Sequence, residues 1–296
     1  MPTGTLHLLA HAKINLALTV GPPDAGGMHP IASWMTAVDL ADEITVTRIG
    51  DGQASVFDRR LEDGTPVPWP EETDLVVRAH RAVERVAGPL PVRVSVVKHI
   101  PAGGGLGGGS SDAAVMLRAL DVHFGLCLGQ AGLVEIALSL GSDIPFFLDE
   151  GVKPGDPPRG ALVTGMGDRV DRLGPRRWPG EWVLICPPFG CETGAVYRAF
   201  DRDPRVFRPG EVERVARGSV FDSSALFNDL AGAAEVVRPD LARIRRGLAD
   251  VLGVGVHVSG SGSTLFVVDP PGGVGAVRRA VSRIEPGAIV VEVTPT

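Results

Sequence analysis

The chain has 296 residues, enough for about two domains with buried cores. Its hydrophobic fraction of 44% and charged fraction of 22% are ordinary for a globular protein, and its net charge of −6 argues against nucleic acid as a partner. No apolar run approaches the roughly 18 residues of a membrane-spanning helix, so no membrane partner is expected. Three cysteines without metal-ligand spacing favour a reducing, cytoplasmic location.

Lysine and asparagine are scarce, which makes each of them informative. The sequence has 26 arginines, but its only lysines are residues 13, 98 and 153 and its only asparagines are residues 15 and 228. Such a chain keeps lysine where a compact ammonium on a flexible stem is needed. Lys13 and Asn15 fall in a strand predicted over residues 5–20, where alternation places both side chains on one side. Protection of an edge strand from aggregation is the alternative role for Lys13.

A turn-rich loop over residues 21–30 follows this strand and carries Met28 and His29. Asp74 is expected to cap the N-terminus of the helix that begins after it. The elements expected in this part of the chain are strands over 31–38, 43–49 and 54–57, a polar loop over 59–73, a helix over 75–86 and a strand over 92–97.

The segment from Pro101 to Ser111 holds six glycines in the seven positions 103–109, and a helix is predicted over 112–120. Without Cβ atoms, the backbone can turn tightly and touch a ligand directly. At a helix start, the unpaired N–H groups and the positive end of the dipole form an anion site. The segment therefore predicts a site for a polyphosphate.

A linker, a Walker A loop and a dinucleotide-binding loop fit this segment less well. A flexible linker rarely joins a strand to an alanine-rich helix. A Walker A loop needs a lysine directly after the glycines, and none is present. Gly103, Gly105 and Gly108 satisfy the dinucleotide pattern Gly-x-Gly-x-x-Gly, but no acidic residue ends a second strand about 20 positions later.

One acidic residue, Asp143, lies among apolar residues in the stretch 140–148, after a short helix predicted over 131–140. A buried carboxylate must be paired, hydrogen-bonded or protonated. A helix-capping role is the alternative to a functional one.

Residues 150–180 are rich in Gly, Pro and Arg, so we expect a boundary there between domains 1–160 and 161–296. The order beyond it is β-α-β-β-α-β, which is typical of a ferredoxin-like domain. Its expected elements are strand 182–186, helices between 193 and 230, helix 241–252, strands 254–258 and 264–268, helix 274–284 and strand 288–293.

The pattern Pro-x-x-x-Gly-Leu-Gly-Gly-Gly-Ser-Ser-x-Ala-Ala that begins at Pro101 resembles the ATP loop of the GHMP kinases. Residues 12–16, 140–145 and 259–264 resemble further motifs of that family, so the resemblance spans most of the chain. It implies an α+β, two-domain GHMP kinase fold, with an N-terminal ribosomal-protein-S5-like ATP-binding domain and a C-terminal ferredoxin-like domain. It also implies ATP and Mg²⁺ as cofactors.

The longer glycine run resembles the branch of the family that phosphorylates the 2-hydroxyl of 4-diphosphocytidyl-2-C-methyl-D-erythritol, in non-mevalonate isoprenoid precursor biosynthesis. The resemblance thus implies a small-molecule kinase with a cytidine-diphosphate-linked substrate, acting as a monomer or homodimer. It makes Asp143 the catalytic acid/base, with Lys13 as its charge partner. Ser110 or Ser111 is the candidate Mg²⁺ ligand. The nucleotide is expected at Lys98, Pro101, Ala102, Gly103, Gly104, Gly105, Leu106, Gly107, Gly108, Gly109, Ser110 and Ser111, and the substrate at Asn15, Met28, His29, Thr193, Tyr197, Gly260, Ser261 and Gly262.

Met28 departs from the family pattern, which has a tyrosine that packs on the cytosine ring. A kinase for another small alcohol or isoprenoid phosphate is therefore an alternative, as is a non-catalytic nucleotide-binding protein. Simpler roles also stay open for single residues: a solvent-facing Lys98, a loop His29 without a role, core packing of Tyr197, and a plain hairpin turn at 259–264.

Overall fold

The computed structural model describes residues 4–296, which form two compact units. The chain passes between the units several times, and its last passage, between residues 158 and 159, is next to the predicted boundary at 160. The assignment of separate domains to 1–160 and 161–296 stays a prediction. The first unit contains residues 4–12, 40–100 and 107–158, and the second contains 13–39, 101–106 and 159–296.

The larger sheet has the strand order β3-β4-β2-β1-β8, and β5 and β6 extend it from β2. β3 runs parallel to β4, whereas β2 is antiparallel to both β4 and β5. The strands are β1 (Thr5–Val20), β2 (Ile31–Arg48), β3 (Val56–Leu61), β4 (Val92–Lys98), β5 (Ala161–Gly165), β6 (Arg169–Arg172) and β8 (Phe227–Asn228).

The strand predictions for this sheet are confirmed for β1 and β4 and need two corrections. The strands predicted over 31–38 and 43–49 are one continuous strand, β2, because Asp42 is fully buried and finds hydrogen-bond donors inside the fold. β3 extends to Leu61, into a segment expected to be loop, because it pairs along its whole length with β4.

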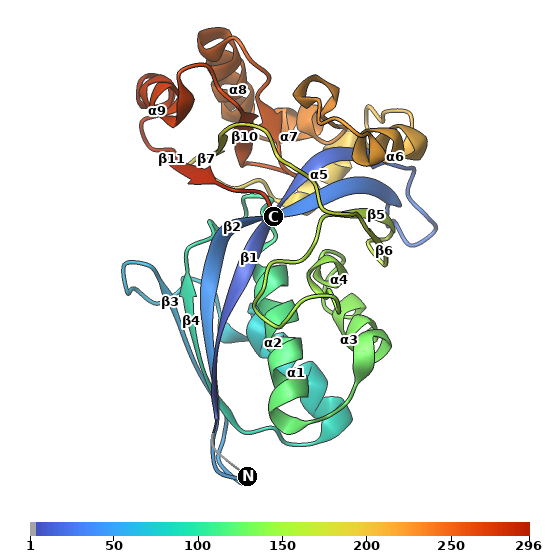
Figure 1. The fold of residues 1–296 in the computed structure, drawn as a ribbon, viewed down its shortest axis with the longest axis vertical. Coiled ribbons are helices and arrows are strands. Elements are labelled where there is room, and N and C mark those ends of the chain that lie inside the picture. Colours follow the sequence, from blue (N-terminus) through green and yellow to red (C-terminus); the bar gives the residue numbers. More distant parts are fainter. Residues whose placement is uncertain (1–3) are drawn as a thin grey trace. The chain divides into compact units, whose positions relative to one another are not determined.

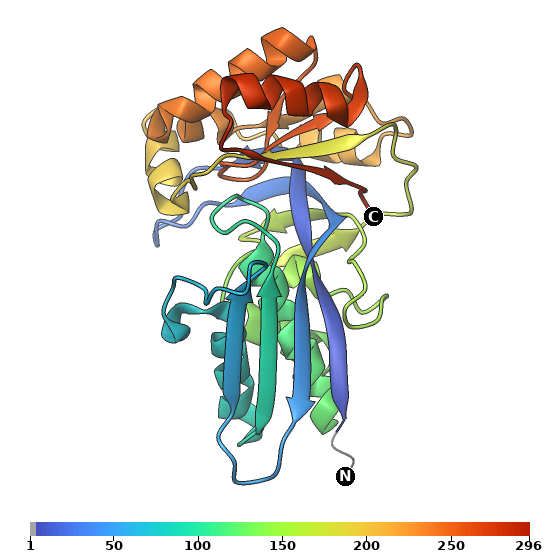
Figure 2. The ribbon, with the colours of Figure 1, turned by 90° about the vertical axis from the view of Figure 1, so that its left-hand side faces the viewer.

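The helices of the first unit lie on one face of its strands (Figure 1 and Figure 2), and α1 and α2 pack against each other. Asp74 caps α1 as predicted, since its carboxylate accepts a hydrogen bond from the Val76 N–H at 2.9 Å. α2 begins at Gly108 and not at residue 112, because Gly107 adopts a left-handed conformation that starts the helix inside the glycine run. The helices are α1 (Leu75–Ala87), α2 (Gly108–Phe124), α3 (Gly129–Leu138) and α4 (Ile144–Phe147).

The second unit contains the ferredoxin-like arrangement that the element order predicted. Its antiparallel sheet has the order β11-β7-β10-β9. The two central strands, β7 and β10, are the first and third of these four strands along the chain. α8 and α9 lie on one face of this sheet (Figure 1). The strand predicted over 254–258 is shorter, His257–Val258. The elements are β7 (Trp182–Cys186), α5 (Thr193–Phe200), α6 (Pro209–Arg217), α7 (Ala231–Val237), α8 (Pro239–Leu252), β9 (His257–Val258), β10 (Leu265–Val268), α9 (Gly273–Ile284) and β11 (Ile289–Val293).

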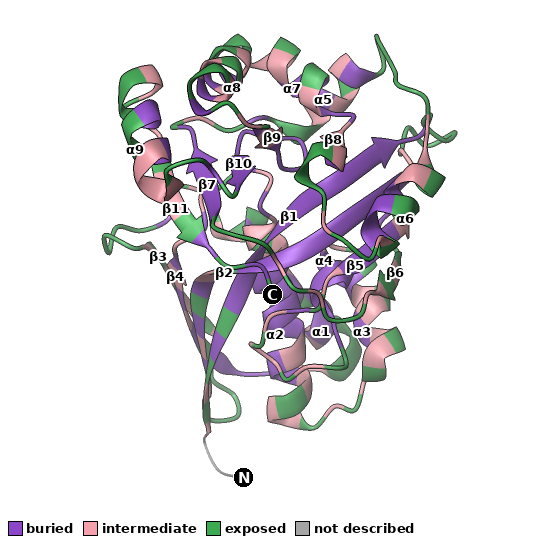
Figure 3. Ribbon diagram, turned by 45° about the horizontal axis from the view of Figure 1, so that its top comes forward, coloured by how far each residue is buried: buried purple, intermediate pink, exposed green. Residues whose placement is uncertain are grey.

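Among the described helices and strands, β1 and β2 have the longest runs of buried residues (Figure 3). β1 is buried from Ala10 to Val20, and β2 from Ile31 to Val38. Polar side chains in these stretches must find partners within the fold, which makes them candidates for a site. Within residues 4–296, no helix has both the length and the apolar character needed to cross a membrane.

Candidate active site

The first half of the glycine segment, residues 101–106, belongs to the second unit and is held through its main chain. Four successive carbonyls of this half accept hydrogen bonds, so its path is fixed by contacts that need no side chain of its own. The donors are Cys191 N–H for Gly103 (3.3 Å), Thr264 N–H for Gly104 (3.0 Å), the Ser259 hydroxyl for Gly105 (3.1 Å) and Lys13 N–H for Leu106 (2.8 Å).

Gly104 and Gly105 are required by close packing at this place. A Cβ on Gly104 would lie 2.6 Å from Thr264 Oγ1, and a Cβ on Gly105 would lie 2.3 Å from the Ser259 carbonyl oxygen. Gly105 also has a φ of +76°, which L-residues with side chains rarely adopt. The glycines therefore let the main chain of the segment pack directly against residues 259–264, with no side chain between them.

The second half of the segment, from Gly107 to Ser111, forms the start of α2 in the first unit. The first N–H groups of a helix have no partner within the helix, and no acidic residue lies in this first turn to occupy them. Gly109 is exposed and Ser110 half-buried, while Ser111 is buried. This helix start has the backbone and the dipole that an anion site needs.

Lys13 and Asn15 form a buried polar pair on β1. Lys13 Nζ donates to Asn15 Oδ1 at 2.6 Å, and Asn15 Nδ2 donates to Ser33 Oγ at 2.9 Å. The two side chains share one side of the strand, as alternation predicted. Protection of an edge strand is wrong as the role of Lys13, because Lys13 is 3% exposed and its main-chain N–H is bonded to the Leu106 carbonyl.

The glycine-rich turn over residues 259–264 lies against this pair. A Cβ on Gly260 would come within 3.2 Å of Asn15 Oδ1 and 3.4 Å of Lys13 Nζ. The Ser261 hydroxyl is 3.0 Å from that of Thr193 at the start of α5. The second unit therefore brings Lys13, Asn15, Thr193 and the glycines of this turn together.

His29 and Tyr197 are neighbours in the second unit, and their role in binding a headgroup stays a prediction. Their ring centroids are 5.1 Å apart with an interplanar angle of 46°. His29 Nδ1 lies 2.9 Å from the Gly21 carbonyl oxygen and Nε2 lies 3.3 Å from Asp201, so both ring nitrogens face acceptors within the protein. Met28 is 53% exposed and therefore available to a ligand.

Asp143 occupies the N-cap position of α4 in the first unit and is half-buried. Its side chain makes no capping hydrogen bond, so a helix-capping role for this residue is wrong. The residues after it, Ile144–Phe147, are all buried and anchor its backbone. The charge pairing of Asp143 with Lys13 stays a prediction.

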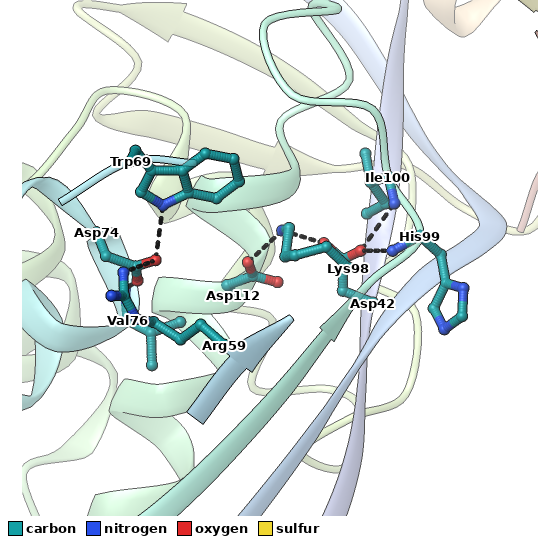
Figure 4. Close-up of polar contacts among 9 residues, drawn as sticks. All are labelled: Asp42, Arg59, Trp69, Asp74, Val76, Lys98, His99, Ile100 and Asp112. Carbon is teal, nitrogen blue, oxygen red and sulfur yellow. Dashed lines mark hydrogen bonds and ion pairs between the residues drawn. The ribbon is translucent and has the colours of Figure 1, made fainter. Parts of the chain in front are cut away.

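Lys98 is buried and donates to two carboxylates, those of Asp42 and Asp112 (Figure 4). A solvent-facing Lys98 is therefore wrong. Burial lowers the pKa of Lys98, but Asp112 and Asp42 outweigh that effect and the pKa lies above its usual value. Burial raises the pKa of Asp112 to about 8; Lys98 opposes this rise and Asp42 adds to it.

Several residues that hold the glycine segment and the turn at 259–264 in place are missed by reasoning from sequence alone. Asp42 and Asp112 look like ordinary charged residues, and Cys191 and Thr264 act through main-chain groups that any residue has. Asn228 did carry a signal, its rarity in the chain, and its side-chain amide donates to the carbonyls of Val258 (2.8 Å) and Gly260 (2.7 Å). In the described part of the chain, no three His, Cys, Asp or Glu side chains gather as a metal site.

A strand that leads through a glycine-lined turn into an uncapped helix, in a chain that also forms a ferredoxin-like unit, defines the class of the GHMP kinases. The model of the GHMP kinases N terminal domain matches residues 74–151. The 4-diphosphocytidyl-2-C-methyl-D-erythritol kinase of Pelotomaculum thermopropionicum is 34% identical over 87% of this chain and 87% of its own length. That of Corynebacterium efficiens is 36% identical over 88% of this chain and 83% of its own length.

A solved structure supports the same family. A crystal structure of 4-(cytidine 5'-diphospho)-2C-methyl-D-erythritol kinase superposes with a TM-score of 0.72 at 32% identity, covering 98% of this chain and 99% of the other. The chain belongs to the GHMP kinase family and, within it, to the 4-diphosphocytidyl-2-C-methyl-D-erythritol kinases. It is accordingly a small-molecule kinase.

Proposed function

We propose that this kinase transfers the γ-phosphoryl group of ATP to the 2-hydroxyl of 4-diphosphocytidyl-2-C-methyl-D-erythritol, in the cytoplasmic, non-mevalonate synthesis of isoprenoid precursors. The single observation that carries the proposal is the start of α2, where glycines expose main-chain N–H groups to an anion. The relatives named above support the acceptor, since this chain covers most of their length.

Phosphoryl transfer depends mainly on positioning and on neutralising charge. In the proposed mechanism, the glycine segment holds the phosphates of ATP through its main chain. Asp143 takes the proton of the acceptor hydroxyl as that oxygen attacks the γ-phosphorus, and the bond from the γ-phosphorus to the β–γ bridging oxygen breaks to release ADP. Lys13 keeps Asp143 ionised and offsets charge on the transferred group.

The residues present fit a Mg²⁺ ion that is held chiefly by the nucleotide. Mg²⁺ commonly uses few protein ligands together with substrate phosphates and water, and it would neutralise phosphate charge here. Ser110 and Ser111 both lie in the first turns of α2, and Ser110 is the better candidate because it is the less buried of the two.

For the acceptor, we propose that Tyr197, His29 and Met28 contact the cytosine ring. Because both ring nitrogens of His29 face protein acceptors, its ring face and main chain are the parts left to contact a ligand. Thr193, Ser261 and Asn15 would hold the polar part of the acceptor, as expected from their grouping in the second unit. The methionine at position 28, where the family pattern has a tyrosine, favours one alternative, a kinase for another small alcohol or isoprenoid phosphate.

An acceptor panel tests the proposal. Purified protein is given ATP and Mg²⁺ with 4-diphosphocytidyl-2-C-methyl-D-erythritol, mevalonate, homoserine or phosphomevalonate, and ADP release is followed. We expect turnover with the cytidine compound alone and a loss of at least about 100-fold in kcat for Asp143→Ala. Turnover with another acceptor only would establish the alternative, and near-normal turnover of Asp143→Ala would remove Asp143 from the mechanism.

A further inference from the structure

Asp42, Lys98 and Asp112 form a cluster that connects the two ends of the glycine segment (Figure 4). Lys98 is the last residue of β4 and precedes the segment, whereas Asp112 lies in α2 directly after it. Asp42 comes from β2. All three belong to the first unit, and Lys98 Nζ bonds one carboxylate oxygen of each aspartate.

The N-terminal end of the segment is fixed by the other oxygen of Asp42. Asp42 Oδ1 accepts hydrogen bonds from the N–H groups of His99 at 2.6 Å and Ile100 at 2.8 Å. Asp42 is fully buried, so these bonds do not compete with water. The backbone immediately before Pro101 is therefore held in one position.

The C-terminal end of the segment is packed on the same place. A Cβ on Gly108, the first residue of α2, would lie 2.9 Å from Ile100 Cγ2 and 3.4 Å from Asp42 Oδ2. The absence of that Cβ lets the helix start rest on the end of β4. Asp112, one turn further along α2, then receives the Lys98 ammonium.

The cluster places one ammonium between two carboxyl groups, and burial raises the pKa of Asp112 to about 8, so a proton on Asp112 balances the charges near neutral pH. Asp112 is 4% exposed, and its Oδ1 has no hydrogen-bond partner in the structure as described. Buried ion pairs of this kind add little stability compared with apolar side chains of similar volume. A gain in stability therefore does not account for the cluster. What accounts for it is the fixed position that it gives β2, β4 and α2 relative to one another.

We propose that Asp42, Lys98 and Asp112 are positioning residues that hold the two ends of the glycine segment together, so that the N–H groups at the start of α2 are arranged before ATP binds. Preorganised donors lower the cost of ordering a loop on binding. Lys98 then serves the nucleotide through the backbone and not by touching its phosphates. The role in ATP binding rests on the proposed function, whereas the clamp itself does not.

Two substitutions of Asp112 separate a clamp from simple packing. Asp112→Leu has the same number and branching of side-chain heavy atoms, with two methyl groups in place of the two oxygens, and cannot accept from Lys98, whereas Asp112→Asn keeps an acceptor oxygen. We expect Asp112→Leu to raise the KM for ATP about tenfold while the KM for the acceptor stays within about twofold. We expect Asp112→Asn to restore the KM for ATP to within about threefold of the wild type. Hydrogen exchange, followed by mass spectrometry without ligand, should speed up in peptides covering 99–112 for the Leu variant alone.

His80→Leu is the matched control, because His80 is another buried polar side chain of the first unit, bonded to the Leu90 carbonyl at 2.8 Å. It should lower the melting temperature without changing the KM for ATP. If Asp112→Leu does not fold, Lys98→Met/Asp112→Leu removes the ammonium together with one carboxylate and leaves Asp42 its main-chain donors.

Equal rises in both KM values, or unchanged exchange over 99–112, would overturn the clamp. A wild-type protein that does not bind ATP would refute the proposed function instead, and the exchange experiment would still test the clamp.

Discussion

The N–H of Lys13 donates to the carbonyl of Leu106 at 2.8 Å, so the lysine proposed to act in catalysis is tied by its own main chain to the glycine segment. Its ammonium is aimed by a second contact, at 2.6 Å to Asn15 Oδ1. The backbone of Lys13 thus holds the glycine segment, while its side chain holds the ammonium in a defined position. We expect substitutions here to affect the reaction more than the fold.

Lys13→Met tests the charge. The substitution keeps the length of the side chain but removes the ammonium, and loss of one preorganised charge-stabilising group commonly costs about 10²- to 10³-fold in kcat. We expect a loss in this range, measured as steady-state ADP release, with the melting temperature unchanged or higher because a buried charge is gone. Asn15→Leu should produce a smaller loss, since it leaves the ammonium in place. A Lys13→Met enzyme with wild-type kcat would exclude Lys13 from the chemistry.

Gly105→Ala tests the close approach of the glycine segment to the turn at 259–264. The new methyl group would lie 2.3 Å from the Ser259 carbonyl oxygen at a φ of +76°, so the segment must move. We expect kcat/KM for ATP to fall by at least about tenfold and the protein to lose roughly 1–3 kcal/mol of stability. Gly52→Ala is the control, because it has a φ of +83° but no atom within 4 Å. Similar kcat/KM values for the two variants would show that only backbone strain matters.

Met28→Tyr tests the headgroup position. Met28 is 53% exposed, so a larger side chain can be accommodated, and an aromatic pair adds about 0.5–1.5 kcal/mol beyond the buried area. If the acceptor carries cytosine, its KM should fall about two- to tenfold, while the KM for ATP stays constant. Met28→Leu should bring no gain, because it adds no ring. An unchanged acceptor KM in the Tyr variant would place the base elsewhere.

His257 predicts a loss of stability in acid. Burial, with a smaller contribution from Arg245, lowers the pKa of His257 to about 4 in the folded protein, whereas the unfolded chain has the usual 6.5. Between these values the unfolded state binds more protons, so the free energy of unfolding falls as the pH drops from about 6.5 to 4, by up to roughly 3 kcal/mol. Urea unfolding across this range measures the slope. His257→Gln should flatten it and exposed His7→Gln should not, and equal slopes for both variants would rule out His257 as the cause.

Several features of the fold and of the candidate site could be predicted from local sequence. Six glycines between a strand and an alanine-rich helix predict a tight turn that exposes main-chain N–H groups, and the structure forms such a turn at the start of α2. The alternation along β1 places Lys13 and Asn15 on one side, and the order of strands and helices after residue 181 gives the ferredoxin-like sheet. The rarity of lysine also drew attention to Lys98 and Lys13, which are both buried.

Other features depended on contacts between distant residues and could not be predicted. The continuous strand β2 contains Asp42, which is bonded to a segment more than 50 residues away, and the early start of α2 combines the left-handed Gly107 with the packing of Gly108 on Ile100. Nothing local distinguishes Asp42 or Asp112 from surface carboxylates. Burial beside a single ammonium gives them their properties, and burial is decided by the tertiary structure, since only the packed chain removes water from both.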